Sequence, residues 1–169
     1  LGGLMVGITI SALRDPQIRM IKYLKLTPLM LVPGIVIIQI WNWYSSVHFP
    51  SGSHQIMPFE NWQWHHMGQT LSTIVVIMLK KGAYFGMMLI LSAMSFIALF
   101  KYSSRFDSFA LIAGCTFVGY NMFLLFVYLA IYGGYSGANA LSYWRYNMHL
   151  AHLGAFCAAY GLSILWRTY

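Results

Sequence analysis

Long apolar runs separated by short polar turns make up most of the chain. Four runs approach or reach the ~20 residues that a helix needs to cross a membrane. They extend over Leu26 to about Tyr44, Gly82–Phe100, Ser108 to about Tyr132, and Met148–Trp166. A fifth run, Leu1–Leu13, is shorter, and we expect it to be the end of a helix that a longer chain completes. The pattern predicts an all-α fold, a polytopic membrane helix bundle of about four to five transmembrane helices.

The segment of about residues 65–79 has a different pattern. Its apolar residues recur at the spacing of one helical face, at Leu71, Ile74, Val75, Met78 and Leu79. The polar residues Gln69, Thr70 and Thr73 lie away from this stripe. At ~1.5 Å per residue, the segment covers only ~22 Å of a ~30 Å hydrocarbon core. We therefore expect one interfacial amphipathic helix here. The alternative is a short span that thins the bilayer.

Residues 45–66 form the longest polar segment, and they contain no Lys or Arg. A segment without these cations is typical of the outer side of a membrane, so we expect an ordered outer loop. If residues 65–79 do not span, the outer side also carries Lys80, Lys81 and Arg145, against seven cations on the inner side. The charge rule gives the same score if they do span. The length of the segment therefore decides, and it favours the interfacial helix.

Composition indicates an integral membrane protein. The chain is 59% hydrophobic and 8% charged, whereas soluble domains contain about 25% charged residues. The chain contains ten Lys and Arg residues and three acidic residues. Because the cations lie at the ends of apolar runs, lipid headgroups account for them and nucleic acid is not an expected partner. We interpret residues 1–169 as a single membrane domain surrounded by membrane lipids and other transmembrane subunits.

The clearest candidate site begins at Arg145, followed by His149 and His152 at i+4 and i+7. If one helix contains all three, they share a face. A guanidinium binds phosphate with two parallel hydrogen bonds, and a nearby imidazole can donate another. The alternative is an Arg that extends to lipid phosphate, with two histidines that bond to neighbouring helices.

Lys80 and Lys81 extend this hypothesis. If they lie on the same side as Arg145, the three cations form a clamp suited to a lipid phosphate or diphosphate. Tyr143 and Trp144 would line the site beside the two histidines. The alternative for the two lysines is an ordinary helix-end pair at the headgroups.

We predict no cofactor. Haem b is disfavoured because two axial histidines usually come from facing helices, whereas His149 and His152 share one. A zinc site from the outer loop has suitable ligand types but no recognised spacing. Its residues would be His48, His54, Glu60, His65 and His66.

Catalytic residues are unassigned. Glu60 is the only acid on the expected outer side, so it is the one candidate for a catalytic carboxylate on that face. The alternative is a surface glutamate in a loop.

Several short patterns resemble the carboxy-terminal membrane part of large C-type-fold glycosyltransferases and their bacterial polysaccharide-polymerase relatives. The patterns are Tyr120-Asn121-x-Phe123-Leu124, Ser142-Tyr143-Trp144-Arg145-Tyr146-Asn147-x-His149-Leu150, Trp43-Tyr44, Pro58-x-x-x-Trp62 and Lys81-Gly82-x-Tyr84-Phe85. The resemblance implies sugar transfer from a polyprenyl-phosphate carrier on the non-cytoplasmic face of a bacterial inner membrane. It also implies a catalytic acid in an early outer loop that this chain does not contain. Arg145, Lys80 and Lys81 would then lie near the carrier phosphate.

Two functions remain open from the sequence. The first is a fragment of a polyprenyl-phosphate-dependent glycosyltransferase or polysaccharide polymerase, which the polar outer loop and the neighbouring cations favour. The alternative is a non-catalytic transmembrane subunit of a larger respiratory or photosynthetic complex. The shortage of acids and the small size favour the alternative.

Overall fold

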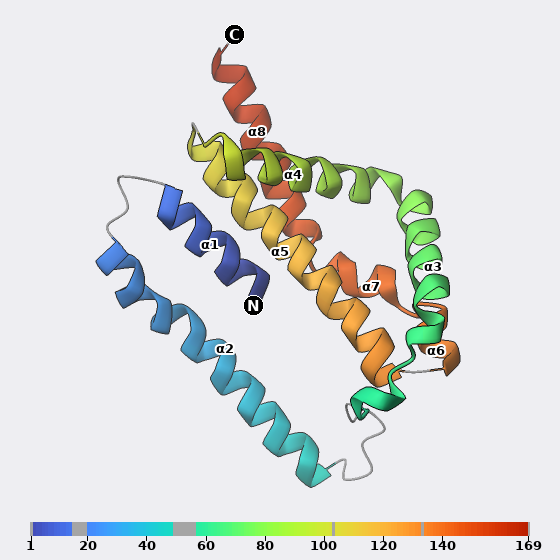
Figure 1. Cartoon of the computed structure of the whole chain (residues 1–169). Coiled ribbons are helices and arrows are strands. Elements are labelled where there is room, and N and C mark those ends of the chain that lie inside the picture. The colour runs from blue at the N-terminus through green and yellow to red at the C-terminus, as the bar shows by residue number, and fades with distance from the viewer. Residues whose placement is uncertain (1, 15–19, 49–56, 103, 133, 169) are drawn as a thin grey trace.

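The computed structural model describes residues 2–14, 20–48, 57–102, 104–132 and 134–168. Within these ranges every regular element is a helix (Figure 1). The α-helices are α1 (Gly2–Arg14), α2 (Met20–His48), α3 (Met67–Lys80), α4 (Gly82–Phe100), α5 (Arg105–Val127), α6 (Gly134–Ala138), α7 (Tyr143–Met148) and α8 (Ala151–Thr168). Short 3₁₀ helices cover Phe59–Asn61 and Trp64–His66, and a π-helix, Tyr128–Tyr132, continues α5. The predicted all-α class is confirmed.

A helical hairpin of α4 and α5 forms the centre of the fold. Ser104 caps the start of α5: its hydroxyl accepts from the Asp107 amide, and the Asp107 carboxylate accepts from the Ser104 amide at 2.7 Å. This reciprocal pair satisfies amides that the first helical turn leaves without partners. The stretches Gly82–Phe100 and Phe106–Tyr132 are long and apolar enough to cross a membrane. The described part of the chain thus supports two of the four to five predicted spans.

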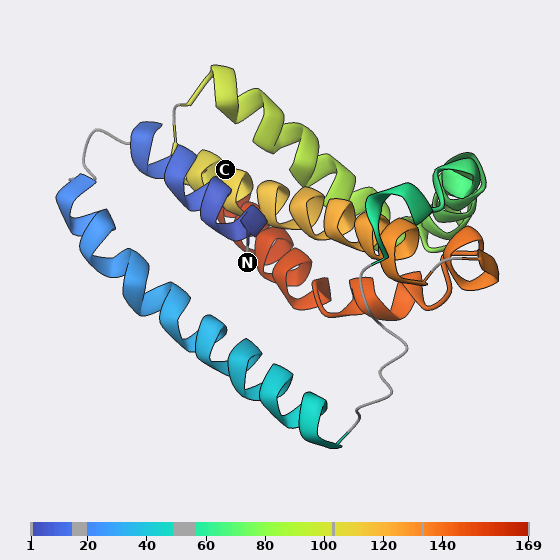
Figure 2. The ribbon, with the colours of Figure 1, turned by 60° about the horizontal axis from the view of Figure 1, so that its bottom comes forward.

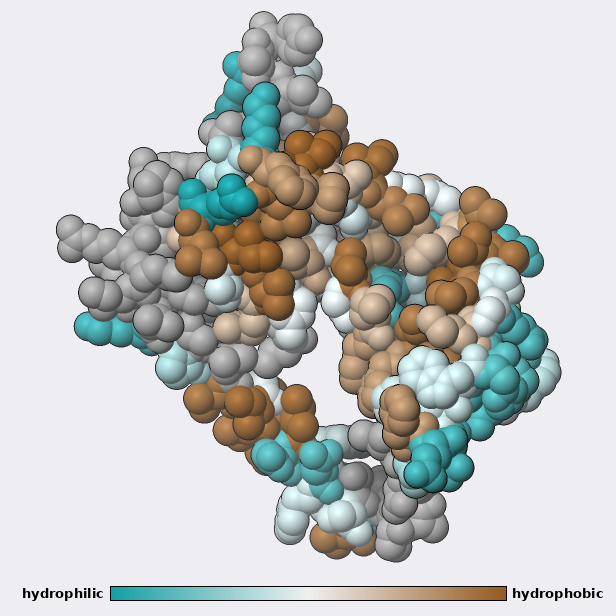
Figure 3. All heavy atoms as spheres, in the orientation of Figure 1, coloured by the Kyte–Doolittle hydropathy of each residue, from teal (hydrophilic) through white to brown (hydrophobic). Residues whose placement is uncertain are grey.

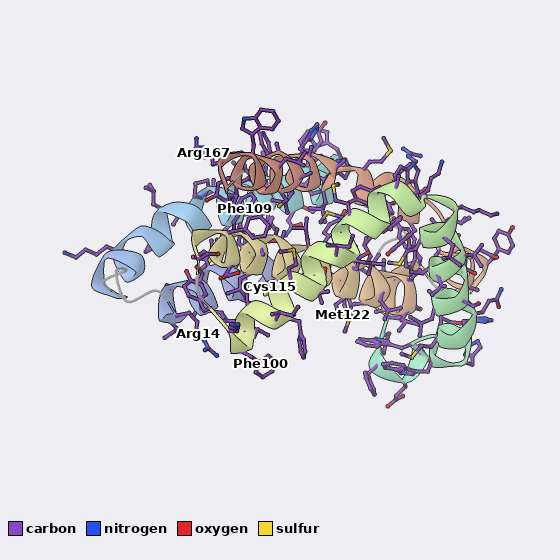
Figure 4. All side chains as sticks on the ribbon, turned by 90° about the horizontal axis from the view of Figure 1, so that it is seen from above. Arg14, Phe100, Phe109, Cys115, Met122 and Arg167 are labelled. Atoms are coloured by element: carbon purple, nitrogen blue, oxygen red, sulfur yellow. The ribbon has the colours of Figure 1, made fainter. Side chains whose placement is uncertain are left out.

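Helix α1 packs against α5 through glycines (Figure 4). A Cβ on Gly119 would lie 2.7 Å from the Gly3 Cα, and one on Gly7 would lie 2.8 Å from the Ile112 Cα. Side chains at these positions would separate the two backbones. Gly3 and Gly7 are four residues apart, the small-residue spacing of close helix pairs in membranes, so the sequence contained this signal.

Helix α3 lies across the open end of the hairpin. Figure 2 shows α3 nearly end-on while α4 and α5 run across the view. The helix is 14 residues long and confirms the predicted helical segment at about residues 65–79. Thr70 is fully buried and donates to the Gly137 carbonyl at 3.1 Å, and Thr73 donates to the Ala138 carbonyl at 3.4 Å. Thr70 and Thr73 therefore direct their hydroxyls into the protein, whereas Gln69 and Ser72 of the same helix are exposed.

The outward face of α3 carries large apolar side chains beside the exposed polar residues Gln69 and Ser72. Leu71, Val75 and Leu79 are 39%, 52% and 75% exposed, whereas Ile74 turns inward and is buried. The single apolar stripe expected from the sequence is thus divided between the core and the surface. Apolar side chains also cover the outer surfaces of α2 and α4 (Figure 3).

Three boundaries differ from the sequence-based predictions. The outer loop expected at residues 45–66 begins later, because α2 continues to His48. Both 3₁₀ helices lie within the range expected for the loop, and residues 49–56 lie outside the described ranges. The segment expected as a turn between the runs that end at about Tyr132 and begin at Met148 contains α6 and α7. The last span, expected at Met148–Trp166, corresponds to α8 and begins three residues later, because a turn at His149–Leu150 separates α7 from α8.

Candidate functional site

A pocket of about 310 Å³ lies at the corner where α3 meets α4. Ile77 and Lys80 of α3 and the adjoining Lys81 line it together with Tyr143, Trp144 and Arg145 of α7. The structure therefore brings together five of the residues singled out from the sequence. The segment Asn139–Ser142, which joins α6 to α7, completes the lining, and we call it the inner wall.

The pocket is positively charged. The side chains of Lys80, Lys81 and Arg145 are exposed, and no acidic residue is among the described residues of the lining. Lys81 is the one residue between α3 and α4, so the break between the helices presents two consecutive lysines. Its Nζ lies 5.3 Å from the centre of the Trp144 ring, a cation–π contact between two residues of the lining.

Hydroxyl groups from the hairpin hold α7 in place. The helix ends at Met148, which leaves its last carbonyls without partners from its own turns. Tyr84 of α4 donates to the Asn147 carbonyl at 2.8 Å, and Tyr120 of α5 donates to the Tyr146 carbonyl at 3.0 Å. These bonds fix the short helix that carries Arg145 against both long helices.

A polar cluster lies behind the pocket. Tyr143 donates from its hydroxyl to the Asn121 Oδ1, which also accepts from the Asn147 Nδ2 at 3.2 Å. Asn147 is fully buried, and its own Oδ1 has no hydrogen-bond partner among the described residues. Burial raises the pKa of the Tyr143 phenol, so it stays protonated and remains a donor at neutral pH.

The inner wall has an uncommon backbone. Ala140 and Ser142 have positive φ angles of 43° and 64°, a region that residues with a side chain rarely adopt. The Tyr128 hydroxyl donates to the Leu141 carbonyl, between them, at 2.9 Å. The sequence analysis did not identify the wall, because positions 140 and 142 do not carry the Gly or Asn that usually marks a positive φ angle. It therefore did not identify Tyr128, which bonds to the wall.

His149 and His152 do not line the pocket. Both side chains are exposed. The same-face argument requires one helix from Arg145 to His152, whereas Arg145 is in α7 and His152 is in α8. The structure therefore separates these histidines from the cation group with which the sequence had joined them.

Glu60 lies far from the pocket. It is exposed in Phe59–Asn61, the first of the two 3₁₀ helices before α3, whereas Lys80 is the last residue of α3. The 14 residues of α3 correspond to about 21 Å of helix. A carboxylate at Glu60 is thus not positioned to act on a group bound between Lys80, Lys81 and Arg145.

The histidines considered as zinc ligands in the sequence analysis make separate contacts. His48 stacks on Tyr44 with ring centres 4.1 Å apart, and the rings of His65 and His66 are 4.0 Å apart. Among the described residues, no three of His, Cys, Asp and Glu come together as metal ligands. The remaining zinc candidate, His54, lies outside the described ranges.

No family model, curated protein or solved structure matches the chain. The chemistry of the pocket therefore has to be inferred from its residues. Three cations and aromatic rings can bind and orient an anion, and the described residues of the lining supply no carboxylate.

Proposed function

We propose that this chain is a polytopic integral membrane protein whose pocket binds the phosphate group of a membrane lipid. The observation that supports this most directly is that Lys80, Lys81 and Arg145 line one pocket at the end of an apolar helix. Charge-assisted bonds from lysine and arginine are the strongest that a protein offers to phosphate.

The orientation of α3 supports a position at the membrane interface. In water, an amphipathic helix directs its polar side chains outward. Here Thr70 and Thr73 bond inward, and Val75 and Leu79 are exposed. An apolar outer face is favourable against lipid, so we place α3 along the bilayer surface as an interfacial helix.

Aromatic side chains at the same end of the hairpin support this placement. Phe59, Trp62 and Trp64 pack together with ring centres 5.0 to 5.7 Å apart. The Gln63 amide donates to the Leu129 carbonyl at 3.1 Å and so ties this cluster to the end of the long span. Tryptophan is enriched where hydrocarbon meets headgroups.

The charge of the pocket selects the headgroup. A phosphomonoester or diphosphate carries about two or more negative charges at neutral pH, with a second pKa near 6. A zwitterionic lipid would bring an ammonium group that no acid of the described lining could pair. Leu79 is 75% exposed beside Lys80, and it offers apolar contact to the hydrocarbon chain of the same lipid.

The corresponding enzymatic role is carrier binding in a polyprenyl-phosphate-dependent glycosyltransferase or polysaccharide polymerase of a bacterial inner membrane. The resemblance of residues 142–150 to these enzymes supports it. On this proposal, Lys80, Lys81 and Arg145 hold the phosphate, and the catalytic acid is supplied from outside this pocket.

A specific observation favours the second candidate, a non-catalytic subunit of a larger membrane complex. Helix α2 stands apart from the other helices (Figure 1). Its side chains Leu29, Ile37 and Trp43 are 70%, 66% and 67% exposed. Other transmembrane subunits would cover this surface, and α2 would then be the principal contact.

The test is a lipid-binding titration. The purified protein is placed in phosphatidylcholine nanodiscs and titrated with farnesyl phosphate, with inorganic phosphate in a parallel arm. Replacing Lys80, Lys81 and Arg145 together by Ala should lower the affinity for farnesyl phosphate by about 100-fold, because each charge-assisted bond contributes about 1.5–3 kcal/mol and the losses overlap.

The matched control is Lys101→Ala, an exposed cation at the other end of α4. It should bind as the wild type does. Equal losses in the two variants would indicate only a general charge effect and would contradict the proposal. Equal binding of inorganic phosphate and farnesyl phosphate would identify a site for free anions rather than for lipid.

A further inference from the structure

The inner wall of the pocket is held in a conformation that its residues do not favour. Ala140 and Ser142 both have positive φ angles, 43° and 64°, within three consecutive residues. In this region the Cβ atom crowds the backbone, so such conformations persist only where the surrounding structure fixes them. Whatever fixes the wall therefore also fixes the shape of the pocket.

The Tyr128 side chain forms a hydrogen bond with the backbone at the centre of the wall. Its hydroxyl donates to the carbonyl of Leu141, the residue between the two positive-φ positions, at 2.9 Å. Tyr128 is 1% exposed and lies in the π-helix that ends the long span. The Leu141 amide donates to the Ser136 carbonyl at 3.2 Å, so the peptide groups before and after the Leu141 Cα each have a hydrogen bond.

The path from Tyr128 to the pocket is close-packed. A Cβ on Gly137 would lie 2.4 Å from the Tyr128 carbonyl oxygen. The backbone of α6 therefore contacts the π-helix directly. Since α6 leads into the wall, this contact holds the chain next to the π-helix immediately before residues 139–142.

We infer that Tyr128 is a positioning residue of the phosphate pocket. Its hydroxyl holds the inner wall in the left-handed conformation in which the wall lines the same pocket as Lys80 and Lys81. The inference rests on the proposed function. Tyr128 is not among the lining residues, so it acts through the Leu141 carbonyl and not by contact with the ligand.

The experiment compares Tyr128→Phe with the matched control Tyr132→Phe. Both remove one hydroxyl from the same π-helix, but the Tyr132 hydroxyl bonds to the Tyr146 hydroxyl instead of the wall. The first measurement is amide hydrogen exchange of residues 139–143 in detergent without lipid. The second is the affinity for farnesyl phosphate in phosphatidylcholine nanodiscs.

Tyr128→Phe should accelerate exchange of the wall amides and weaken farnesyl phosphate binding, each by roughly two- to tenfold, as expected for loss of one hydrogen bond. Tyr132→Phe should leave wall exchange unchanged. Ser142→Gly, measured alone and with Tyr128→Phe, provides a rescue, because glycine adopts positive φ without steric cost. In the double variant, binding should return toward that of Ser142→Gly alone.

Each other outcome has a defined meaning. Unchanged wall exchange in Tyr128→Phe would overturn the inference. Faster exchange with unchanged binding would also overturn it, since the wall would then not shape the site. Absence of rescue would show that strain at Ser142 is not what the hydroxyl opposes. A wild type that does not bind farnesyl phosphate, with wall exchange responding as expected, would instead reject the proposed function.

Discussion

The positive charge of the pocket comes from side chains that are close in space and have no acid beside them in the described lining. Lys80 and Lys81 are consecutive, and Arg145 reaches the same pocket from α7. The ring of Trp144 holds the Lys81 ammonium through a contact of 5.3 Å. Such contacts contribute about 0.5–1 kcal/mol at exposed sites, so the cations are arranged without being neutralised.

The histidines provide the first prediction at this scale. His149→Ala and His152→Ala should each leave farnesyl phosphate affinity unchanged, because neither side chain lines the pocket. Arg145→Ala should weaken binding about tenfold or more, through the loss of charge-assisted hydrogen bonds. The nanodisc titration measures all three. A histidine variant that loses as much affinity as Arg145→Ala would restore the original grouping of these residues.

Asn121 provides the second residue-scale prediction. Its Oδ1 accepts from the Tyr143 hydroxyl and from the Asn147 Nδ2. Asn121→Leu would leave the Tyr143 hydroxyl without its acceptor, whereas the Asn147 Nδ2 would keep its bond to the Tyr143 carbonyl at 3.2 Å. Loss of the acceptor for the buried hydroxyl costs about 1–3 kcal/mol. Thermal unfolding in detergent should therefore show a clear decrease in Tm.

The control for this variant is Met122→Leu, at the neighbouring position, which is 63% exposed. It should change Tm little, because the two side chains are similar in volume. If Asn121→Leu were as stable as Met122→Leu, the buried polar cluster would not contribute to stability.

At the scale of elements, the contact between α1 and α5 depends on the absence of side chains. Gly3 and Gly119 bring the two backbones together, and a Cβ on Gly119 would lie 2.7 Å from the Gly3 Cα. In a membrane, packing of small residues replaces the hydrophobic effect as the cause of helix association. The short helix α1 is thus held by close backbone contact.

Two alanine substitutions should have opposite effects. Gly119→Ala should destabilise the protein by about 1–3 kcal/mol, because backbone atoms would have to move apart. Gly86→Ala, in α4, has nothing within 4 Å of the added Cβ and should stabilise by up to about 1 kcal/mol through helix propensity. Thermal unfolding in the same detergent measures both, and a decrease of equal size for the two would contradict the packing argument.

At the scale of the whole molecule, α3 bridges the open end of the α4–α5 hairpin and positions the pocket there. Figure 1 shows α4 and α5 diverging from their connecting turn, with α3 and α6 at the far end. The cations Lys80 and Lys81 therefore lie at the end of the hairpin opposite Lys101. If the hairpin spans a bilayer, this arrangement places the pocket near the headgroups, as our proposal requires.

The depth of α3 can be measured directly. A nitroxide at Val75→Cys, after replacement of Cys115 and Cys157 by Ser, should be relaxed by oxygen more than by a water-soluble nickel complex, because Val75 faces lipid in our proposal. A label at Lys101→Cys should show the reverse preference. Power-saturation electron paramagnetic resonance in liposomes makes the comparison, and a water-exposed Val75 would contradict the interfacial position of α3.

The local sequence determined where the long helices lie. The predicted run Gly82–Phe100 has the same bounds as α4, because lysines at 81 and 101 enclose an uninterrupted apolar stretch. The cations and aromatic residues of the pocket were also identifiable, since charge in such an apolar chain is rare and functionally suggestive. The local sequence pattern was sufficient for these features, because the position of a helix and the type of a side chain depend on residues that are adjacent along the chain.

Tertiary structure alone decided how these elements combine. Thr70 turns inward and donates to the Gly137 carbonyl, which lies 67 positions later in the chain. The wall adopts its left-handed form with the Tyr128 hydroxyl bonded to it. The break after Met148 separates His152 from Arg145, with Tyr84 and Tyr120 bonded to the carbonyls near the end of α7. These features depend on hydrogen bonds between distant segments, which hydrophobic periodicity does not encode.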